Sequence, residues 1–417
     1  MKFKPTTSRS SPYRMAALAG IVAIAATAAC GAVSSPQAHG SQRVDYQASS
    51  SHPGGNLVSV VPVEDLQPAE VSARLQAAGF EAARVRYGVT AYRVVYRTVG
   101  ARGEPTTASQ LVALPDNDED DLRVVSWLHG TTVYRGDVAS MKPDSSDRAV
   151  ALLFASTGRA VSAPDYLGLG EGPGHHTYGD PDTTVSASVD ALRAARKLAG
   201  QHGRRLDERV LVSGFSQGGP ATMLVGRALQ EGVERHFELG ALAPIAGPFH
   251  LSRFEADAAD DKVANAALYL AYFTIAWDRL YGLYNSPREA FLEPYATEVE
   301  TLFDGHHKPQ EIAAALPARS DELFTADFLE QIRNPTGELS RRLRPLDTTC
   351  DWRPDVPVHI YHASGDSDVS LDHARYCQQQ LKSNGATEKL TDVGDVDHNT
   401  TVRRAVPQVA GVFDRAG

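Results

Sequence analysis

The chain has 417 residues, of which 42% are hydrophobic and 22% charged, and its formal net charge is −10 at pH 7. This length is sufficient for one large α/β domain with an additional subdomain. The excess of acidic residues argues against a nucleic acid and against a strongly anionic surface as the partner.

The N-terminus has the organisation of a secretory signal. Residues 15–29 are uncharged and rich in alanine, and four basic side chains precede them: Lys2, Lys4, Arg9 and Arg14. A basic region followed by an apolar run of this length is typical of a signal peptide rather than of a membrane-spanning helix. Cys30 directly follows Thr27-Ala28-Ala29, which resembles a bacterial lipoprotein lipobox. Residues 1–30 are therefore predicted to end at an acylated cysteine, with simple secretion after signal removal as the alternative.

The next segment, residues 31–56, is rich in Ser, Gly, Gln, Ala and Pro and has almost nothing to bury. Burial in such a segment does not offset the entropy lost on ordering, so we expect a flexible tether. The remaining residues, 57–417, are predicted to form the folded domain.

Strand-like and helix-like segments alternate along most of this domain. Two runs joined by a turn that contains Gly and Pro, 92–98 and 108–114, are typical of an antiparallel hairpin. Further strands are predicted at 122–128, 160–163, 210–212, 241–246, 356–361 and 388–393, and helices at about 145–157, 183–202, 217–231, 371–383 and 400–415. This alternation predicts a mostly parallel sheet covered on both faces, and the leading hairpin makes it the order of the α/β-hydrolase fold.

Residues from about 250 to 345 interrupt the alternation. They contain no convincing strand but several amphipathic helical runs, including an aromatic-rich one at 264–279. Helices inserted between two strands of a sheet form a cap that must bury one face on the body. We expect this cap to shape access to a substrate, because the same apolar face can line a channel for an acyl chain.

A candidate nucleophile stands in Gly214-Phe215-Ser216-Gln217-Gly218, which follows a β-rich run and precedes a helix-length segment. In this context G-x-S-x-G is the nucleophile elbow, a tight turn that exposes a serine Oγ at the top of a sheet. The flanking glycines are expected to permit that turn. The motif predicts Ser216 as the nucleophile, with an ordinary βα turn as the alternative.

An oxyanion hole is expected beside this serine. The predicted strand 122–128 ends in His129-Gly130-Thr131-Thr132. In this fold the loop after that strand supplies one backbone N–H, and the residue after the nucleophile supplies the other. These positions nominate the amides of Thr131 and Gln217, while His129 is predicted to hold the loop rather than to act as a base.

The acid and the base of a triad are expected later in the chain. Residues 359–370 contain two carboxylates, Asp366 and Asp368. This stretch resembles the H-G-x-x-D-x-x-V-P segment of such hydrolases, which favours Asp366, whereas a shifted count favours Asp368. Of the 14 histidines, His398 alone lies after the last predicted strand and before the last predicted helix. Ser216, Asp366 and His398 then follow the α/β-hydrolase order.

Once Cys30 is set aside, two cysteines remain, Cys350 and Cys377. In an oxidising compartment this pair predicts one disulfide, worth about 3–4 kcal/mol in the chain-entropy model, and two separate buried thiols are the alternative. Neither cysteine has the spacing of a metal ligand, and the histidine pairs 175–176 and 306–307 lack a third ligand. No metal or organic cofactor is therefore expected.

Five segments together resemble the secretory lipase family of α/β-hydrolases and its bacterial relatives: Trp127–Thr132, Pro164–Gly170, Gly214–Gly219, the Asp366 loop and His398. The resemblance spans about residues 85–405. It implies extracellular hydrolysis of esters, often of acylglycerols, with a helical lid before the strand that bears the acid.

We therefore predict a secreted or membrane-tethered serine carboxylic-ester hydrolase that forms an acyl-enzyme on Ser216. Its partner would be a small-molecule or lipid ester, and lipase and esterase are not distinguished. Three alternatives stay open: a peptidase or amidase on the same fold, an acyltransferase, and a binding lipoprotein with an inactive triad.

Overall fold

The computed structural model describes residues 54–416, so the predicted signal segment, Cys30 and the tether up to residue 53 lie outside the described residues. Near the beginning of this range, Gly55 is already hydrogen-bonded to the domain, because its N–H donates to the Arg97 carbonyl at 2.8 Å. No helix between residues 54 and 416 combines the length and the apolar character needed to cross a membrane.

The centre of residues 54–416 is one sheet of nine strands in the order β1-β2-β3-β5-β4-β6-β7-β8-β9. The first three strands run antiparallel to their neighbours, and the strands from β5 to β9 are parallel. The strands are β1 (Leu57–Leu66), β2 (Gly88–Val99), β3 (Pro105–Asp116), β4 (Asp121–Leu128), β5 (Ala160–Pro164), β6 (Arg205–Phe215), β7 (Glu238–Ile245), β8 (Val358–His362) and β9 (Glu388–Asp392). The sheet thus has the predicted mixed order, with an antiparallel start that leads into parallel strands.

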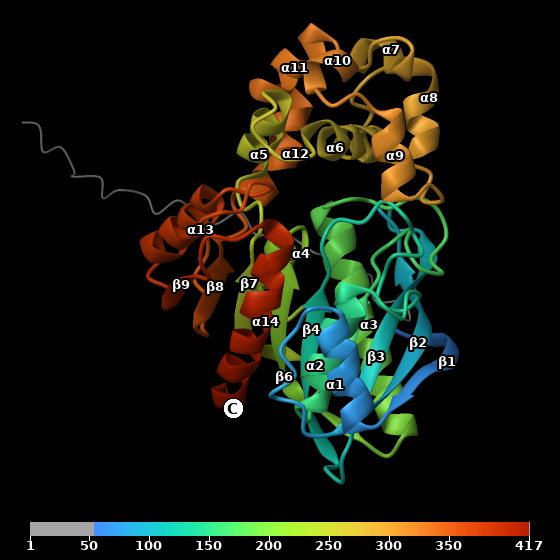
Figure 1. Cartoon of the computed structure of the whole chain (residues 1–417), viewed down its shortest axis with the longest axis vertical. Coiled ribbons are helices and arrows are strands. Elements are labelled where there is room, and N and C mark those ends of the chain that lie inside the picture. Colours follow the sequence, from blue (N-terminus) through green and yellow to red (C-terminus); the bar gives the residue numbers. More distant parts are fainter. Residues whose placement is uncertain (1–53, 417) are drawn as a thin grey trace, which may run out of the picture. The chain divides into compact units, whose positions relative to one another are not determined.

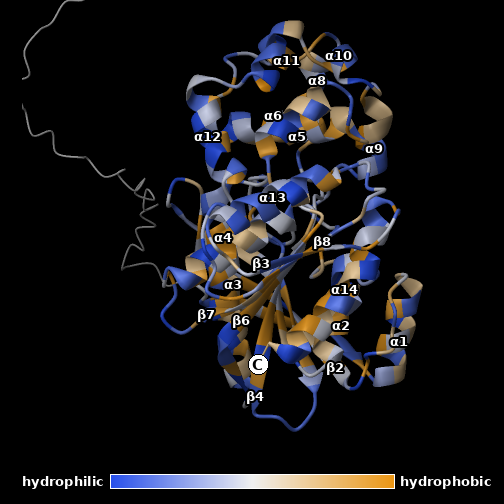
Figure 2. Cartoon of the chain, turned by 90° about the vertical axis from the view of Figure 1, so that its left-hand side faces the viewer, coloured by the Kyte–Doolittle hydropathy of each residue, from blue (hydrophilic) through white to orange (hydrophobic). Residues whose placement is uncertain are grey.

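Helices cover both faces of this sheet and form two separate cores (Figure 1). One face is packed by α3 (Pro181–Gln201), α4 (Gly218–Gln230) and α13 (Leu371–Ser383), and the other by α1 (Pro68–Ala77), α2 (Ser146–Ser156) and α14 (His398–Arg415). Strands that are buried on both faces are hydrophobic along their length rather than alternating. Figure 2 shows this hydrophobic colouring on the central strands β4 and β6.

Two elements are absent from the sequence prediction, the edge strand β1 and the helix α1. β1 pairs with β2 through two register irregularities, contains Pro62 and leaves much of its surface exposed. Its apolar residues therefore lack the regular alternation that marks a strand. α1 buries only Val71 and Leu75, which is too short a periodic pattern to stand out.

The predicted cap is present between β7 and β8. It comprises α5 (Leu251–Ala259), α6 (Ala266–Tyr281), α7 (Pro287–Ala290), α8 (Tyr295–Leu302), α9 (Pro309–Ala315), α10 (Ser320–Leu323), α11 (Ala326–Arg333) and α12 (Gly337–Asp347). The aromatic-rich helix α6 contacts loops at the carboxyl ends of the strands (Figure 1). The Tyr272 hydroxyl donates to the Thr132 carbonyl at 3.0 Å, and the Trp277 indole donates to the Tyr178 carbonyl at 3.1 Å.

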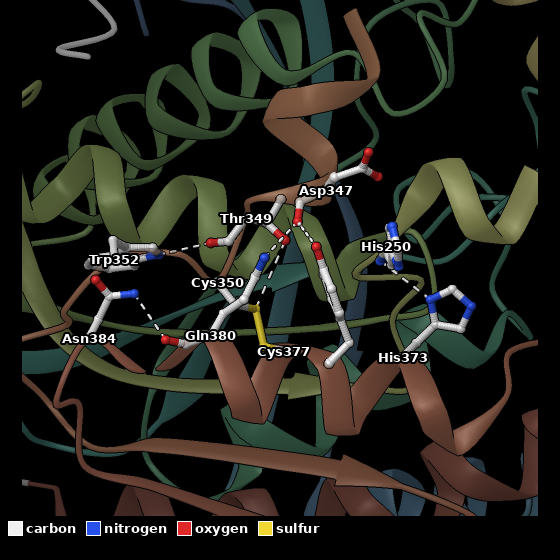
Figure 3. Close-up of a disulfide and its surroundings, with 10 residues drawn as sticks. His250, Asp347, Thr349, Cys350, Trp352, His373, Cys377, Gln380 and Asn384 are labelled. Carbon is white, nitrogen blue, oxygen red and sulfur yellow. Dashed lines mark hydrogen bonds between the residues drawn. A yellow bond between two sulfur atoms is a disulfide. The ribbon is translucent and has the colours of Figure 1, made fainter. Parts of the chain in front are cut away.

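The predicted disulfide is confirmed and lies where the chain leaves the cap (Figure 3). Cys350 follows α12, and Cys377 belongs to α13 of the body, with an S–S distance of 2.01 Å. Gln380 donates to the Asp347 carbonyl at 2.8 Å beside this bond. The last helix of the cap is therefore joined to the body both covalently and by hydrogen bonds.

Candidate active site

Ser216 occupies the sharp turn between β6 and α4. Its φ of +55° lies in the left-handed region, which non-glycine residues seldom adopt. The Ser216 N–H donates to the Ile245 carbonyl at 3.0 Å, and its own carbonyl accepts from the Gly219 N–H at 2.8 Å. Backbone strain of this kind is typical of functional turns that the surrounding structure holds in place.

The glycines around Ser216 permit the tight turn, as the sequence predicts, because a Cβ on Gly214 would lie 2.3 Å from the Gly218 carbonyl oxygen. Neither Gly214 nor Gly218 has a positive φ, so the unusual backbone conformation belongs to the serine itself. A Cβ on Gly218 would lie 1.9 Å from the Leu128 carbonyl oxygen, and a Cβ on Gly214 would lie 2.6 Å from the same atom. The missing side chains therefore let the elbow approach the end of β4.

The loop after β4 lies against the elbow, as an oxyanion hole requires. A Cβ on Gly130 would lie 3.3 Å from the Ser216 Cβ. Thr131 and Gln217 line one cavity together with Ser216. Among the hydrogen bonds of residues 54–416, neither the Thr131 N–H nor the Gln217 N–H has an acceptor. Both amides are thus available to a ligand atom near Ser216.

His129 and Asp165 hold this loop from behind. The two imidazole nitrogens of His129 lie 2.7 Å from the Gly130 carbonyl and 3.2 Å from the Asp165 carbonyl. The buried carboxylate of Asp165 accepts from the hydroxyls of Ser109 at 2.6 Å and Ser140 at 2.5 Å. Burial raises the pKa of Asp165, and the two hydroxyls oppose that shift. His129 therefore has the structural position that the sequence predicts.

The side chain of Gln217 is oriented by His176. His176 Nδ1 lies 2.9 Å from the Leu167 carbonyl, so Nδ1 carries the proton and Nε2 accepts from the Gln217 amide at 3.1 Å. Burial lowers the pKa of His176 to about 4, which keeps the ring in this neutral form. The hydroxyl of Tyr178 lies 3.1 Å from Thr131 Oγ1. Thr131 and Gln217, the two candidates for the oxyanion hole, are therefore both bonded to the segment that carries His176 and Tyr178.

Asp366 and His398 are brought together at the ends of β8 and β9. His398 Nδ1 lies 2.6 Å from Asp366 Oδ2, and both side chains are buried. The other oxygen, Oδ1, accepts from the backbone N–H groups of Asp368 at 3.0 Å and Val369 at 2.9 Å. His398 is the first residue of α14 rather than part of the preceding loop, because the Asp397 side chain caps that helix by accepting from the Thr400 N–H at 2.9 Å.

Asp368 points to the cap instead. Its Oδ1 accepts from the Tyr269 hydroxyl of α6 at 2.9 Å and from the Asn265 amide at 3.4 Å. Of the two carboxylates that the sequence leaves open, Asp366 is therefore the one bonded to His398, and Asp368 is a contact between the body and the cap.

His398 packs against Phe215, the residue that precedes Ser216, and is not hydrogen-bonded to Ser216. The Phe215 ring packs against the His398 imidazole with a centroid distance of 4.5 Å. Residues 54–416 include no hydrogen bond between Ser216 Oγ and His398. Catalytic hydrogen bonds are often long in free enzymes and tighten when substrate binds.

The cavity beside Ser216 is largely apolar. It holds about 650 Å³ of space between atoms, its open mouth included, and the cap supplies part of its wall. The apolar lining includes Leu224, Leu251, Phe254, Phe273, Leu346 and Val369, while Glu255 adds a carboxyl group. The apolar character of this cavity is suitable for an organic group bound beside Ser216.

Several residues of the site carry no sequence signal. His362, fully buried, donates from Nε2 to the Val369 carbonyl at 2.8 Å and so holds the loop that bears Asp366. His176 and Tyr178 likewise bond to residues distant in the chain, and Glu255 joins the cavity lining only through the folding of the cap, so spacing alone does not indicate them. Within the described range, no three His, Cys, Asp or Glu side chains are arranged to hold a metal ion.

Several solved structures are similar to this chain in fold. No family model and no curated protein matches the sequence. Among solved structures, a protein of Legionella pneumophila classed as a hydrolase is 25% identical, with a TM-score of 0.80 over 86% of this chain and 98% of the other. The rice cell wall degrading esterase LipA of Xanthomonas oryzae is 25% identical, with a TM-score of 0.79 over 87% and 98%. Lipase A of Candida antarctica is 14% identical, with a TM-score of 0.60 over 83% and 78%.

These likenesses confirm the predicted fold class. The chain has a secretory-lipase-like α/β-hydrolase fold with a helical cap, as the resemblance of its motifs implied. The chain shares 25% of its aligned residues with the Xanthomonas oryzae esterase and with the Legionella pneumophila protein, so it is structurally akin to an esterase and is hydrolase-like.

Proposed function

We propose that the protein is a serine carboxylic-ester hydrolase with Ser216 as nucleophile, His398 as base and Asp366 as acid. The observation that carries the proposal is the 2.6 Å bond between His398 and Asp366, beside a serine held at φ +55°. Structural kinship to an esterase supports the same class of reaction. The ester would occupy the apolar cavity that Ser216 shares with Thr131 and Gln217.

In the proposed first step, Ser216 Oγ attacks the ester carbonyl carbon while His398 Nε2 takes the serine proton. Nε2 is the nitrogen available for this task, because Nδ1 is bonded to Asp366. Asp366 fixes the tautomer and stabilises the imidazolium. The free amides of Thr131 and Gln217 stabilise the negative charge on the carbonyl oxygen, and one such donor is typically worth about 10²–10³ in rate.

The intermediate then collapses to an acyl-enzyme. The carbon–oxygen bond to the alcohol breaks, and the alcohol leaves with the proton that His398 carried. Water attacks the acyl-enzyme by the same route, which releases the carboxylic acid and regenerates Ser216. The reaction derived from these residues requires no further co-reactant than water.

The test compares wild type with Ser216→Ala, beginning at residue 54 and using p-nitrophenyl esters from acetate to palmitate. We expect kcat to fall by about 10⁶ in the variant, because the triad acts as a unit. A fluorophosphonate should label wild type alone, and Ser340→Ala, an exposed serine of α12, is the matched control. Labelling without ester turnover would favour an amidase or an acyltransferase. A folded protein with neither signal would favour a binding lipoprotein.

The site of action is proposed to be outside the cytoplasm. The signal-like residues 1–30 and the disulfide between Cys350 and Cys377 support secretion, since disulfides persist in oxidising compartments. Attachment through acylated Cys30 is tested by incorporation of labelled palmitate, which Cys30→Ser should abolish. Equal incorporation in the variant would contradict lipidation at this position.

A further inference from the structure

One carboxyl group in the cavity lacks any partner. Glu255 lies on the cap helix α5 and is only 2% exposed. Neither of its carboxyl oxygens makes a hydrogen bond within residues 54–416, and Oε2 is completely shielded from solvent. Glutamate is almost never fully buried without a partner, because a buried polar group that forms no hydrogen bond destabilises the fold. A group retained under these conditions is a candidate for ligand binding.

The surroundings of Glu255 do not compensate it. Glu255 lines the same cavity as Ser216, together with the apolar side chains of Leu251 and Phe254. Burial alone raises the pKa of Glu255 far above its ordinary range, without a contribution from any charged neighbour. The nearby Tyr178 hydroxyl makes no hydrogen bond to Glu255 and lies 3.1 Å from Thr131 Oγ1. Burial therefore favours the protonated, uncharged form of this carboxyl inside the apolar cavity.

We propose that Glu255 determines substrate specificity by hydrogen bonding to a hydroxyl group on the part of the ester that fills the cavity. The substrate class is thus a hydroxylated ester rather than a plain alkyl ester. This inference rests on the proposed esterase function of Ser216 and adds the chemistry of the bound group. Glu255 is a binding residue in this account and takes no part in bond breaking.

A hydroxyl fits this carboxyl better than a cation does. The neutral acid has one O–H donor and a carbonyl acceptor, and a hydroxyl both accepts and donates. An ammonium group would have to leave water for an apolar cavity, and the acid would have to release its own proton to water before the two could pair, so both charges would be removed from water. An alkyl chain would leave the carboxyl unbonded, as it is in the free protein.

The experiment measures kcat/KM for matched methyl and ethyl esters by titration of the released acid. One series carries a terminal hydroxyl on the acyl chain, a second carries it on the alcohol chain, and each hydroxylated ester has a plain and an amino-terminated counterpart. Wild type, Glu255→Leu and Glu255→Gln are compared. Glu298→Gln is the matched control, because Glu298 is an exposed glutamate of the cap helix α8.

We expect wild type to prefer the hydroxylated ester by about tenfold in one of the two series, as one additional hydrogen bond allows. The preference should fall to about unity in Glu255→Leu and persist in part in Glu255→Gln, whose amide can still donate and accept. Glu298→Gln should keep the wild-type ratio. Equal rates for plain and hydroxylated esters in wild type, or a preference that survives in Glu255→Leu, would overturn the proposal. A preference for the amino-terminated ester would overturn it in favour of a cationic substrate.

Failure of the esterase function would give a different result, namely no turnover of any ester by wild type. The inference about Glu255 is then judged by equilibrium binding of the same esters to Ser216→Ala, which does not depend on catalysis. Tighter binding of the hydroxylated ester that is lost when Glu255→Leu is added would support the hydroxyl site. Equal binding of plain and hydroxylated esters would overturn it.

Discussion

The body and the cap contribute opposite kinds of buried polar group to the surroundings of Ser216. On the body side, Asp366 accepts three hydrogen bonds, and His176 uses both of its ring nitrogens. On the cap side, the buried Glu255 has none. The saturated groups hold reacting atoms in place, whereas an unbonded one is available to a ligand. The proposed reaction therefore depends on the body, and the proposed specificity depends on the cap.

Two aspartates that are two positions apart should differ most in their effect on kcat. Asp366→Asn should lower kcat by about 10⁴, because asparagine cannot hold the His398 tautomer that its carboxylate favours. Asp368→Asn should change kcat by less than about tenfold, since its oxygen can still accept from the Tyr269 hydroxyl of the cap. Steady-state kinetics on one p-nitrophenyl ester measures both. A larger loss in Asp368→Asn than in Asp366→Asn would show that Asp368, and not Asp366, is the acid.

The tight contact between the elbow and β4 gives the next largest effect, this time on stability. Gly218→Ala would place a Cβ 1.9 Å from the Leu128 carbonyl oxygen, so the free energy of unfolding should fall by about 4 kcal/mol. Gly200→Ala is the matched control in α3, where no atom lies within 4 Å of the new Cβ, and it should stabilise by about 0.5–1 kcal/mol. Urea unfolding tests the pair, and similar effects for both alanines would contradict the close approach.

The disulfide tests how much of the stability depends on the joint between cap and body. Cys350 and Cys377 are 27 residues apart, and closing a loop of that length is worth about 3.5 kcal/mol in the chain-entropy model. The double variant Cys350→Ser/Cys377→Ser should lose that amount in urea unfolding, and it avoids leaving a free thiol. Reducing agent should destabilise wild type and leave the double variant unaffected. Unfolding that is insensitive to the reductant in both proteins would show that the bond adds no stability.

The elements that sequence predicts well are those whose signal is local. The alternation of strands and helices yields the parallel part of the sheet, and the G-x-S-x-G spacing indicates Ser216 because the elbow is built from five consecutive residues. The bond from His176 to Gln217 joins residues 41 positions apart, and no local pattern reports it. The same limit applies to the contact of Gly214 and Gly218 with the Leu128 carbonyl, because that contact depends on how β4 lies beside β6.

The smallest of these effects concerns pH and the orientation of Gln217. The pKa of His176 is lowered from 6.5 to about 4 in the fold, because burial disfavours the charged ring. A lowered pKa means that the unfolded chain binds the proton first as the pH falls. The stabilising contribution of His176 is therefore complete above pH 6.5 and is lost as the pH falls to about 4, by about 3 kcal/mol in total.

His176→Gln isolates this contribution, because the glutamine side chain can donate to the Leu167 carbonyl and accept from Gln217 without titrating. The free energy of unfolding of wild type should decrease more steeply than that of the variant between pH 6.5 and about 4. His373 has a pKa lowered to about 4 as well, but it is present in both proteins, so its share cancels in the difference. Parallel pH profiles would mean that His176 titrates alike in the folded and unfolded chains. The body side of the cavity would then be less rigidly bonded than its hydrogen bonds indicate, and the contrast with Glu255 would be weaker.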